Sequence, residues 1–314
     1  MGIVKSHLDR WSLSRREFWR KLTPSCGHAD CRLTPSLWRR LRGQPRTVVI
    51  QGLRYCRDEC VERALANALQ RVRSNVQRPV APHRVPLGLM LLSRQQLTVV
   101  QLRAALGAQR DAGHGRIGEW LQTLGFVSEQ HVTAALARQW SCPVLRTTSL
   151  NPSASRAPRI PLTLLDAFVM IPVDYVATTA TLHIAFGEAI DYSVLYAIEQ
   201  MLGCRTESCM AVPSFVRQNL QALSGHREES EVVFDRVADC AEFLRIVRSY
   251  SVRLSATEIR LAACGPHLWA RLLRTACPPL DVLLRNFWHV PSPASSLGPS
   301  APLSSLKSLL PLPM

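Results

Sequence analysis

The sequence predicts a multi-domain α+β protein. Three features support this: a helical tandem repeat in the middle of the chain, alternating strand and helix patterns directly after it, and a cysteine-bearing segment before it. At 314 residues and 47% hydrophobic, the chain is long enough for two or three compact units. We expect a helical repeat unit with a small α/β unit, a small cysteine-bearing head and a C-terminal α+β unit.

Proline-rich and polar stretches suggest the boundaries between these units. The expected order is a basic N-terminal segment (1–22), a cysteine module with a helix (23–77), a linker (78–84), a central domain (85–223), an α+β unit (229–288) and a disordered Pro/Ser-rich tail (289–314). The central domain divides into a tandem helical repeat (85–142) and an α/β half (143–223).

Positive charge is concentrated at the start of the chain. Residues 1–84 contain 18 Lys and Arg against 6 Asp and Glu, a net of +12 within a whole-chain net charge of +15. This imbalance indicates either an anionic partner, such as nucleic acid, acidic protein or anionic lipid, or an Arg-rich solvated leader. No stretch has the ~20 clean apolar residues of a membrane span, and no secretory pattern is visible. We therefore expect a cytoplasmic protein.

The cysteine module contains two close pairs of cysteines. A predicted hairpin, with strands around Thr47–Ile50 and Leu53–Tyr55, separates the pairs, and a predicted helix at Cys60–Val76 follows. The residues of the two pairs are Cys26, Cys31, Cys56 and Cys60. Four thiolates suit a tetrahedral Zn²⁺ site, and free or buried thiols are the alternative.

The second pair, at the start of a helix, resembles treble-clef zinc knuckles of the TRASH or MYM type. In those knuckles two residues usually separate the first pair of cysteines, whereas four separate Cys26 from Cys31. The resemblance therefore implies a structural zinc for which His28 could replace one of the four ligands.

The repeat appears when the chain is aligned with itself at a shift of 30 residues. Each copy is expected to form a helix, a tight turn and a second helix. In the second copy Gly125 suits a left-handed position after the first helix, and Ser128 suits the cap of the second helix. In the first copy, Thr98 and Gln101 form a capping box. The matched pairs include Gly88 with Gly118, Leu91 with Leu121, and Gln109 with Gln139.

The spacing of Arg, Gly, aliphatic and Gln residues in this repeat resembles the tandem motif of the MshEN domain. That domain lies at the N-terminus of bacterial type II secretion and type IV pilus assembly ATPases, and some members bind cyclic di-GMP. The second copy fits well, with Arg116 in the Arg position. In the first copy Pro86 stands in the Arg position and Gln95 in that of the second Gly. The resemblance continues into the α/β half, at Ile171-Pro172 and Leu182–Phe186.

The resemblance implies a set of nucleotide-binding residues. A guanidinium such as that of Arg116 can stack on a guanine and hydrogen-bond phosphate oxygens in a planar fork. The alternative is that the Gly and Leu residues only pack the two helices, and for the Leu residues alone this interpretation is preferred. The implied set comprises Arg116, Ile117, Gly118, Leu121, Gly125 and Gln139 from the second copy and Leu87, Gly88, Leu91 and Gln109 from the first.

The segments after the repeat are predicted from periodicity and turn residues. The α/β half has expected strands at Phe168–Val173, Thr181–Phe186 and Thr206–Val212 and helices at Asp191–Met201 and Pro213–Leu223. The last unit has an expected strand at Glu231–Phe234, a helix at Asp239–Leu254 and a hairpin of Glu258–Ala263 with His267–Leu273.

The chain contains no GxxxxGK[ST] phosphate-binding loop and no catalytic constellation, so we expect a non-enzymatic protein without the ATPase domain of the resembled family. The preferred function is a regulator that binds cyclic di-GMP. The main alternative is a docking adaptor that contacts a secretion or pilus assembly protein and binds no nucleotide. A weaker alternative is a zinc-dependent, nucleic-acid-binding regulator that uses the basic head.

Overall fold

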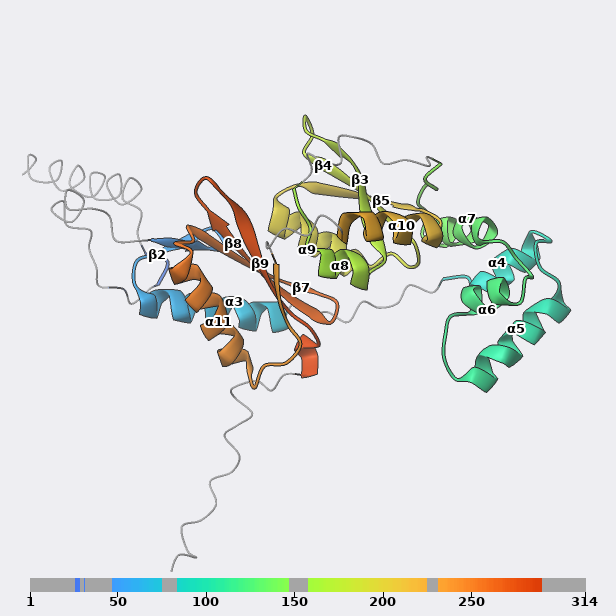
Figure 1. Ribbon diagram of the computed structural model, residues 1–314, viewed down its shortest axis with the longest axis horizontal. Helices are drawn as coiled ribbons and strands as arrows, with labels where there is room; N and C mark the ends of the chain where they lie inside the picture. The colour runs from blue at the N-terminus through green and yellow to red at the C-terminus, as the bar shows by residue number, and fades with distance from the viewer. Residues whose placement is uncertain are drawn as a thin grey trace, which may run out of the picture.

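The computed structural model describes residues 26–28, 31, 47–74, 84–146, 158–224 and 231–289. The predicted basic segment (1–22), nearly all of the linker (78–84) and the predicted disordered tail (289–314, except residue 289) lie outside these residues. Helices and sheets are both present, which confirms the α+β class (Figure 1). No helix in the described part of the chain is long and apolar enough to cross a bilayer.

The helical half of the central domain has the predicted two helix-turn-helix copies. Its helices are α4 (Leu87–Ser93), α5 (Val99–Ala112), α6 (Ile117–Thr123) and α7 (Glu129–Gln139). Thr98 and Gln101 form the predicted capping box, and the Ser128 hydroxyl accepts a hydrogen bond from the His131 amide. Helix α4 packs on α7 and α5 packs on α6, so the copies interlock around the buried Leu91 and Leu121.

The α/β half follows in the predicted order, with one additional helix at its start. Its elements are α8 (Leu162–Ala167), β3 (Met170–Val176), β4 (Thr181–Phe186), α9 (Tyr192–Leu202), β5 (Arg205–Met210) and α10 (Pro213–Ser224). Strand β4 lies in the centre of the sheet, antiparallel to β3 and parallel to β5. The apolar periodicity that predicted these strands and helices corresponds to a continuous core between the sheet and α9 and α10.

A second sheet combines strands from both ends of the described chain. Its elements are β1 (Val48–Ile50), β2 (Leu53–Tyr55), α3 (Asp58–Ser74), β6 (Glu231–Phe234), α11 (Cys240–Arg253), β7 (Glu258–Cys264), β8 (His267–Arg274), β9 (Cys277–Leu284) and the 3₁₀ turn η2 (Phe287–His289). The strand order is β2-β1-β7-β8-β9-β6. The structure thus joins in one sheet the cysteine module and the C-terminal unit, which the sequence analysis describes as separate segments.

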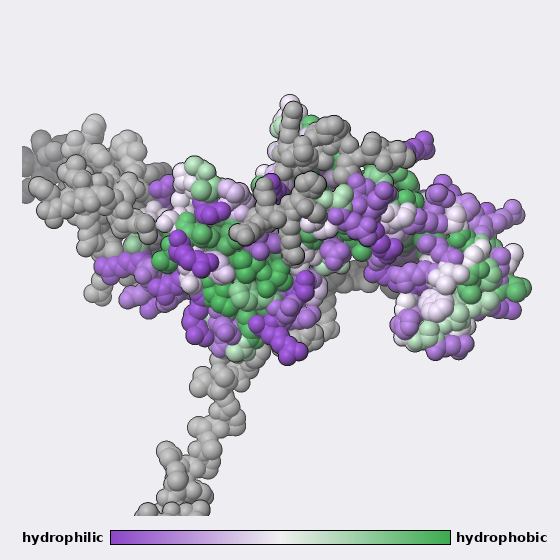
Figure 2. All heavy atoms as spheres, viewed as in Figure 1, coloured by the Kyte–Doolittle hydropathy of each residue, from purple (hydrophilic) through white to green (hydrophobic). Residues whose placement is uncertain are grey.

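This second sheet, which we call the outer sheet, separates two layers of helices. One face packs on α3 and α11 through residues such as Leu65, Phe243 and Leu268. The other face presents Trp269 and Leu283 to the core of the α/β half. Figure 1 shows the order of the layers, with α9 between the outer sheet and the smaller sheet. Hydrophilic residues border the apolar areas on the face that Figure 2 shows.

A buried polar cluster lies where the outer sheet meets the start of α8. The Arg271 Nε is 3.2 Å from the Asp281 Oδ1, and both side chains are almost fully buried. The Trp269 indole donates to the same oxygen at 2.7 Å, and Arg271 donates to the Arg159 carbonyl at 2.7 Å. Glu231 accepts from the Leu162 amide at 2.7 Å and so caps α8. These contacts fix α8 against the outer sheet.

Burial raises the pKa of the Asp281 carboxyl to about 6, despite the opposing effects of Arg271 and Trp269. The folded protein therefore holds a proton that unfolding releases between about pH 4 and pH 6. We expect this group to make the free energy of unfolding fall as pH rises through that window. The Asp281→Asn variant should lose this slope, because its amide does not titrate. Urea unfolding of both proteins from pH 4.5 to 7 measures the slope, and a slope that the substitution leaves unchanged would contradict the assignment.

Candidate functional site

The four predicted cysteines converge on one point. The sulfur atoms of Cys26, Cys31, Cys56 and Cys60 all lie within 4.8 Å of one another. Cys56 follows β2 and Cys60 lies in the first turn of α3, so a strand end and a helix start supply one pair. The other pair is held beside β2, where the Gly27 amide donates to the Arg54 carbonyl at 2.7 Å. This arrangement has the ligand number and proximity of a four-coordinate metal site.

The chemistry of the cluster depends on a cation. Burial, with hydrogen bonds and repulsion from Cys26 and Cys31, raises the pKa of Cys56 to about 12 and that of Cys60 to about 11. Without a cation, the thiols of Cys56 and Cys60 therefore stay protonated at neutral pH, which makes them poor nucleophiles. His28, considered above as a replacement ligand, lies outside the cluster, and its Nε2 is 3.0 Å from an Arg63 nitrogen. The structure therefore brings together the cysteine set without the histidine.

The glycines of the repeat are packing positions. Gly88 and Gly118 are buried, and a Cβ on Gly88 would lie only 2.7 Å from a methyl carbon of Leu102. A Cβ on Gly118 would lie 3.2 Å from methyl carbons of Leu87 and Val132. The two glycines therefore let the second helix of each copy approach the first closely. Leu91 and Leu121 are fully buried beneath them and leave no surface for a ligand.

The two motif glutamines link the copies reciprocally. Gln109 of the first copy donates to the Gly115 carbonyl at 2.8 Å, directly before the second copy. Gln139 of the second copy donates to the Val85 carbonyl at 2.7 Å, directly before the first copy. The end of each copy therefore holds the start of the other in a pseudo-twofold arrangement.

Arg116 is the charged member of the predicted set, and it is exposed. It precedes α6, and 60% of its side chain is exposed. Its guanidinium lies 2.5 Å from the Glu188 carboxylate, whose other oxygen is 3.1 Å from the Arg217 guanidinium. Two exposed guanidinium groups therefore share one carboxylate, and the triad carries a net positive charge. The sequence gives no local signal that Glu188 and Arg217 belong to this site, because 72 positions separate Arg116 from Glu188.

The first copy keeps the backbone of the motif without its charge. Pro86 precedes α4 in the position of Arg116 and offers no cation. Gln95 has φ of +56°, close to the +69° of Gly125 in the matching position. The turn is therefore the same in both copies, and in the first copy a non-glycine residue bears the left-handed conformation.

Comparisons with solved structures find matches over less than half of the chain. A structure of MshE with c-di-GMP is 26% identical over 44% of this chain and 99% of that chain, with a TM-score of 0.38. Two structures of the N-terminal domain of XpsE are 20% identical, covering 43% and 42% of this chain and 91% and 89% of theirs, with TM-scores of 0.35 and 0.26. No family model and no curated protein matches the chain. Over less than half of its length, the chain is thus similar to structures from MshE and XpsE.

The left-handed turn provides a test of how the first copy departs from the motif. We expect Gln95→Gly to raise the free energy of unfolding by about 1 kcal/mol, because glycine adopts a positive φ without steric strain. The matched reverse change, Gly125→Gln, should lower it by about 1 kcal/mol. Urea unfolding followed by circular dichroism measures both. Equal stability of Gln95→Gly and the parent protein would show that the turn in the first copy carries no strain.

Proposed function

We propose that the protein is a non-enzymatic regulator that binds cyclic di-GMP at the surface around Arg116. The observation that carries this proposal is the shared carboxylate: Arg116 and Arg217 both direct a guanidinium at Glu188. Two forked cations at one anionic point suit a phosphate, which accepts bidentate hydrogen bonds in the same plane. The solved structure of MshE with c-di-GMP supports the choice of ligand.

Glu188 stands where the ligand phosphate would bind. The two arginines are more than half exposed, whereas 22% of the Glu188 side chain is exposed. A phosphate can therefore approach the guanidinium groups from solvent and replace the carboxylate. The carboxylate keeps the arginines in position before binding and competes with the phosphate for them. Removing its negative charge should favour the ligand.

The proposed site depends on the second copy. Pro86 supplies no charged contact, and the buried glycines and leucines of both copies act as a scaffold. The loss of one of two arginine contacts corresponds to about 1.5 to 3 kcal/mol, which is about tenfold to a hundredfold in affinity. The affinity should therefore be modest and should depend strongly on Arg116.

Titration calorimetry with cyclic di-GMP tests the proposal. We expect the parent protein to bind and Arg116→Ala to weaken binding by about tenfold to a hundredfold. Glu188→Gln should strengthen binding by about threefold to tenfold, because the competing charge is gone. The exposed Arg103 lies on α5, so Arg103→Ala is a matched control and should change nothing.

Two results would contradict the site. One is binding that Arg116→Ala leaves unchanged, which would move the ligand elsewhere. The other is the absence of binding by both the parent protein and Glu188→Gln, which would favour the docking function described next.

The alternative function, a docking adaptor that contacts a secretion or pilus assembly protein, is favoured by exposed apolar residues in the first copy. Leu89, Val99 and Val100 are 53%, 52% and 75% exposed. The matching positions of the second copy hold Glu119, Glu129 and Gln130. Apolar side chains gather at the surface of the helical half (Figure 2). Exposed apolar patches of this kind mark protein contacts.

We further propose that the cysteine cluster holds a structural Zn²⁺. Four sulfurs in a tetrahedron with Zn–S distances of about 2.3 Å lie about 3.8 Å apart. The Cys31 and Cys56 sulfurs lie 3.4 Å apart, close to this value, and all four sulfurs lie within 4.8 Å of one another. The ion would deprotonate the thiols and tie the segment before β1 to the start of α3.

Metal analysis of protein purified without chelator tests the zinc site. We expect about one zinc per chain in the parent protein, and Cys56→Ser should lower both zinc content and the melting temperature. Cys277 is exposed and lies in β9, so Cys277→Ser is the matched control and should keep the metal. Zinc-free parent protein with an unchanged melting temperature in the presence of chelator would reject the site.

A further inference from the structure

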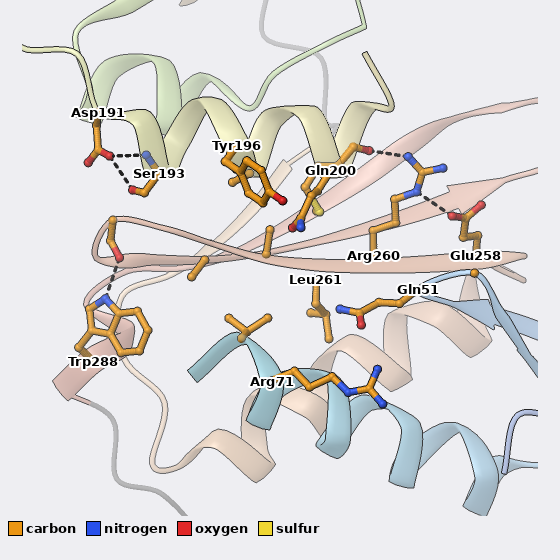
Figure 3. A pocket seen from close by; sticks show the side chains of 17 residues that line it. Gln51, Arg71, Asp191, Ser193, Tyr196, Gln200, Glu258, Arg260, Leu261 and Trp288 are labelled. Carbon is orange, nitrogen blue, oxygen red and sulfur yellow. Dashed lines mark hydrogen bonds and ion pairs between the residues drawn. The ribbon is translucent and has the colours of Figure 1, made fainter. Parts of the chain in front are cut away.

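A groove runs beside β7 of the outer sheet, beyond the end of the short strand β1. It has a volume of about 920 Å³ and is bounded by α9, by the end of α3, by the β1–β2 turn and by η2 (Figure 3). Three consecutive residues of β7, Leu261, Ala262 and Ala263, line it. Successive side chains of a strand point to opposite faces, so three in a row can line one cavity only along the edge of the strand.

The edge of β7 is open because its neighbour is short. Strand β1 pairs with β7 only at Val49 with Glu258 and Ile50 with Ile259. Strand β7 continues to Cys264, and its other side pairs with β8 along the whole length. Beyond Ile50, no strand among the described residues occupies the position beside β7 that β1 begins. We call this strand position the lane of β1. The groove therefore follows a vacant strand position in the sheet.

The backbone groups that face this lane follow from the register. The Val49 amide donates to the Thr257 carbonyl at 2.9 Å, so β1 pairs with the odd-numbered residues of β7. By alternation, Leu261 and Ala263 direct their N–H and C=O groups into the groove. No bond to these groups from this side occurs among the described residues. An added strand would satisfy them.

The walls indicate which side chains such a strand would carry. On one side, Tyr196 and Gln200 of α9 face the lane, and Tyr196 is 65% exposed. On the other side, Arg71 and Val72 lie at the end of α3. Arg260 is already neutralised by Glu258 at 2.7 Å, whereas Arg71 has no acidic partner among the described residues. The α3 side of the groove therefore carries an unbalanced positive charge.

We propose that this groove binds a partner protein by strand addition, taking an extended peptide that alternates acidic and aliphatic side chains. The peptide pairs with Leu261 and Ala263 in the lane that β1 leaves vacant, its acidic side chains facing Arg71 and its aliphatic ones facing Tyr196. Main-chain pairing supplies affinity in such complexes, and alternate side chains supply specificity.

A labelled peptide tests the proposal on the full-length protein. The probe is fluorescein-labelled Val-Glu-Val-Glu-Val, and fluorescence anisotropy measures its binding. Ala263→Pro removes one N–H from the lane and should weaken binding about threefold to tenfold. Arg71→Gln should weaken it about threefold, and Arg103→Gln, on α5, should leave it unchanged. Arg71→Gln keeps the test valid if Ala263→Pro impairs folding.

Two further probes separate strand addition from other modes of binding. The same peptide with alternate N-methylated amides should not bind, because it cannot pair with β7. The amides of Leu261 and Ala263 should exchange rapidly in the free protein and become protected with the peptide. Absent binding, or equal binding of the N-methylated peptide, overturns the proposal. Protection of these amides in the free protein also overturns the proposal, because the lane would then already be filled. Protection that depends on protein concentration would indicate a second copy in the lane, and protection that does not would indicate a segment of the same chain.

Discussion

The parallel pairing of β1 with β7 joins the two ends of the described chain. It involves only two pairs of residues, yet it places the cysteine cluster, α3 and the C-terminal strands in one unit. Because β2 contacts the rest of the sheet through β1, the strand end at Cys56 depends on this pairing, whereas α3 also packs directly on β7 and α11. The cluster in turn ties the segment at Cys26 to β2. A metal there would strengthen an otherwise short edge of the sheet.

The outer sheet also determines how the central domain is held. Trp269 and Leu283 extend the core of the α/β half across the boundary, and Glu231 caps α8 from β6. A second link joins the two halves of the central domain, where Glu129 of α7 accepts hydrogen bonds from the amide and hydroxyl of Ser214 at the start of α10. The Arg116 triad lies across the same boundary. A ligand at the triad would therefore act on the contact between the helical repeat and the α/β half.

Local signals predict the elements whose stabilising contacts are local. The capping box of Thr98 and the glycine turn at Gly125 are examples, because neighbouring residues complete both. Helix α8 escapes prediction because its cap is Glu231, 69 positions away. Strand β9 escapes it because Pro278 and Pro279 stand at its start, and prolines disfavour a strand inside a sheet. The same reason applies to the site: the motif identifies Arg116, whereas only the folded chain brings Glu188 and Arg217 to it.

The two copies of the repeat show that fold and ligand chemistry depend on different residues. The fold needs the close approach at Gly88 and Gly118 and the reciprocal glutamine bonds, and both copies retain them. The proposed ligand chemistry needs an exposed cation at the position of Arg116, where the first copy has Pro86. The first copy can therefore lose its arginine to Pro86 without disturbing the helices, because proline is well suited to a helix start. Its surface is then free to become apolar, as at Val99 and Val100, while the second copy keeps the charge for an anion. The proposed nucleotide site and the alternative docking surface therefore lie on different copies of the repeat.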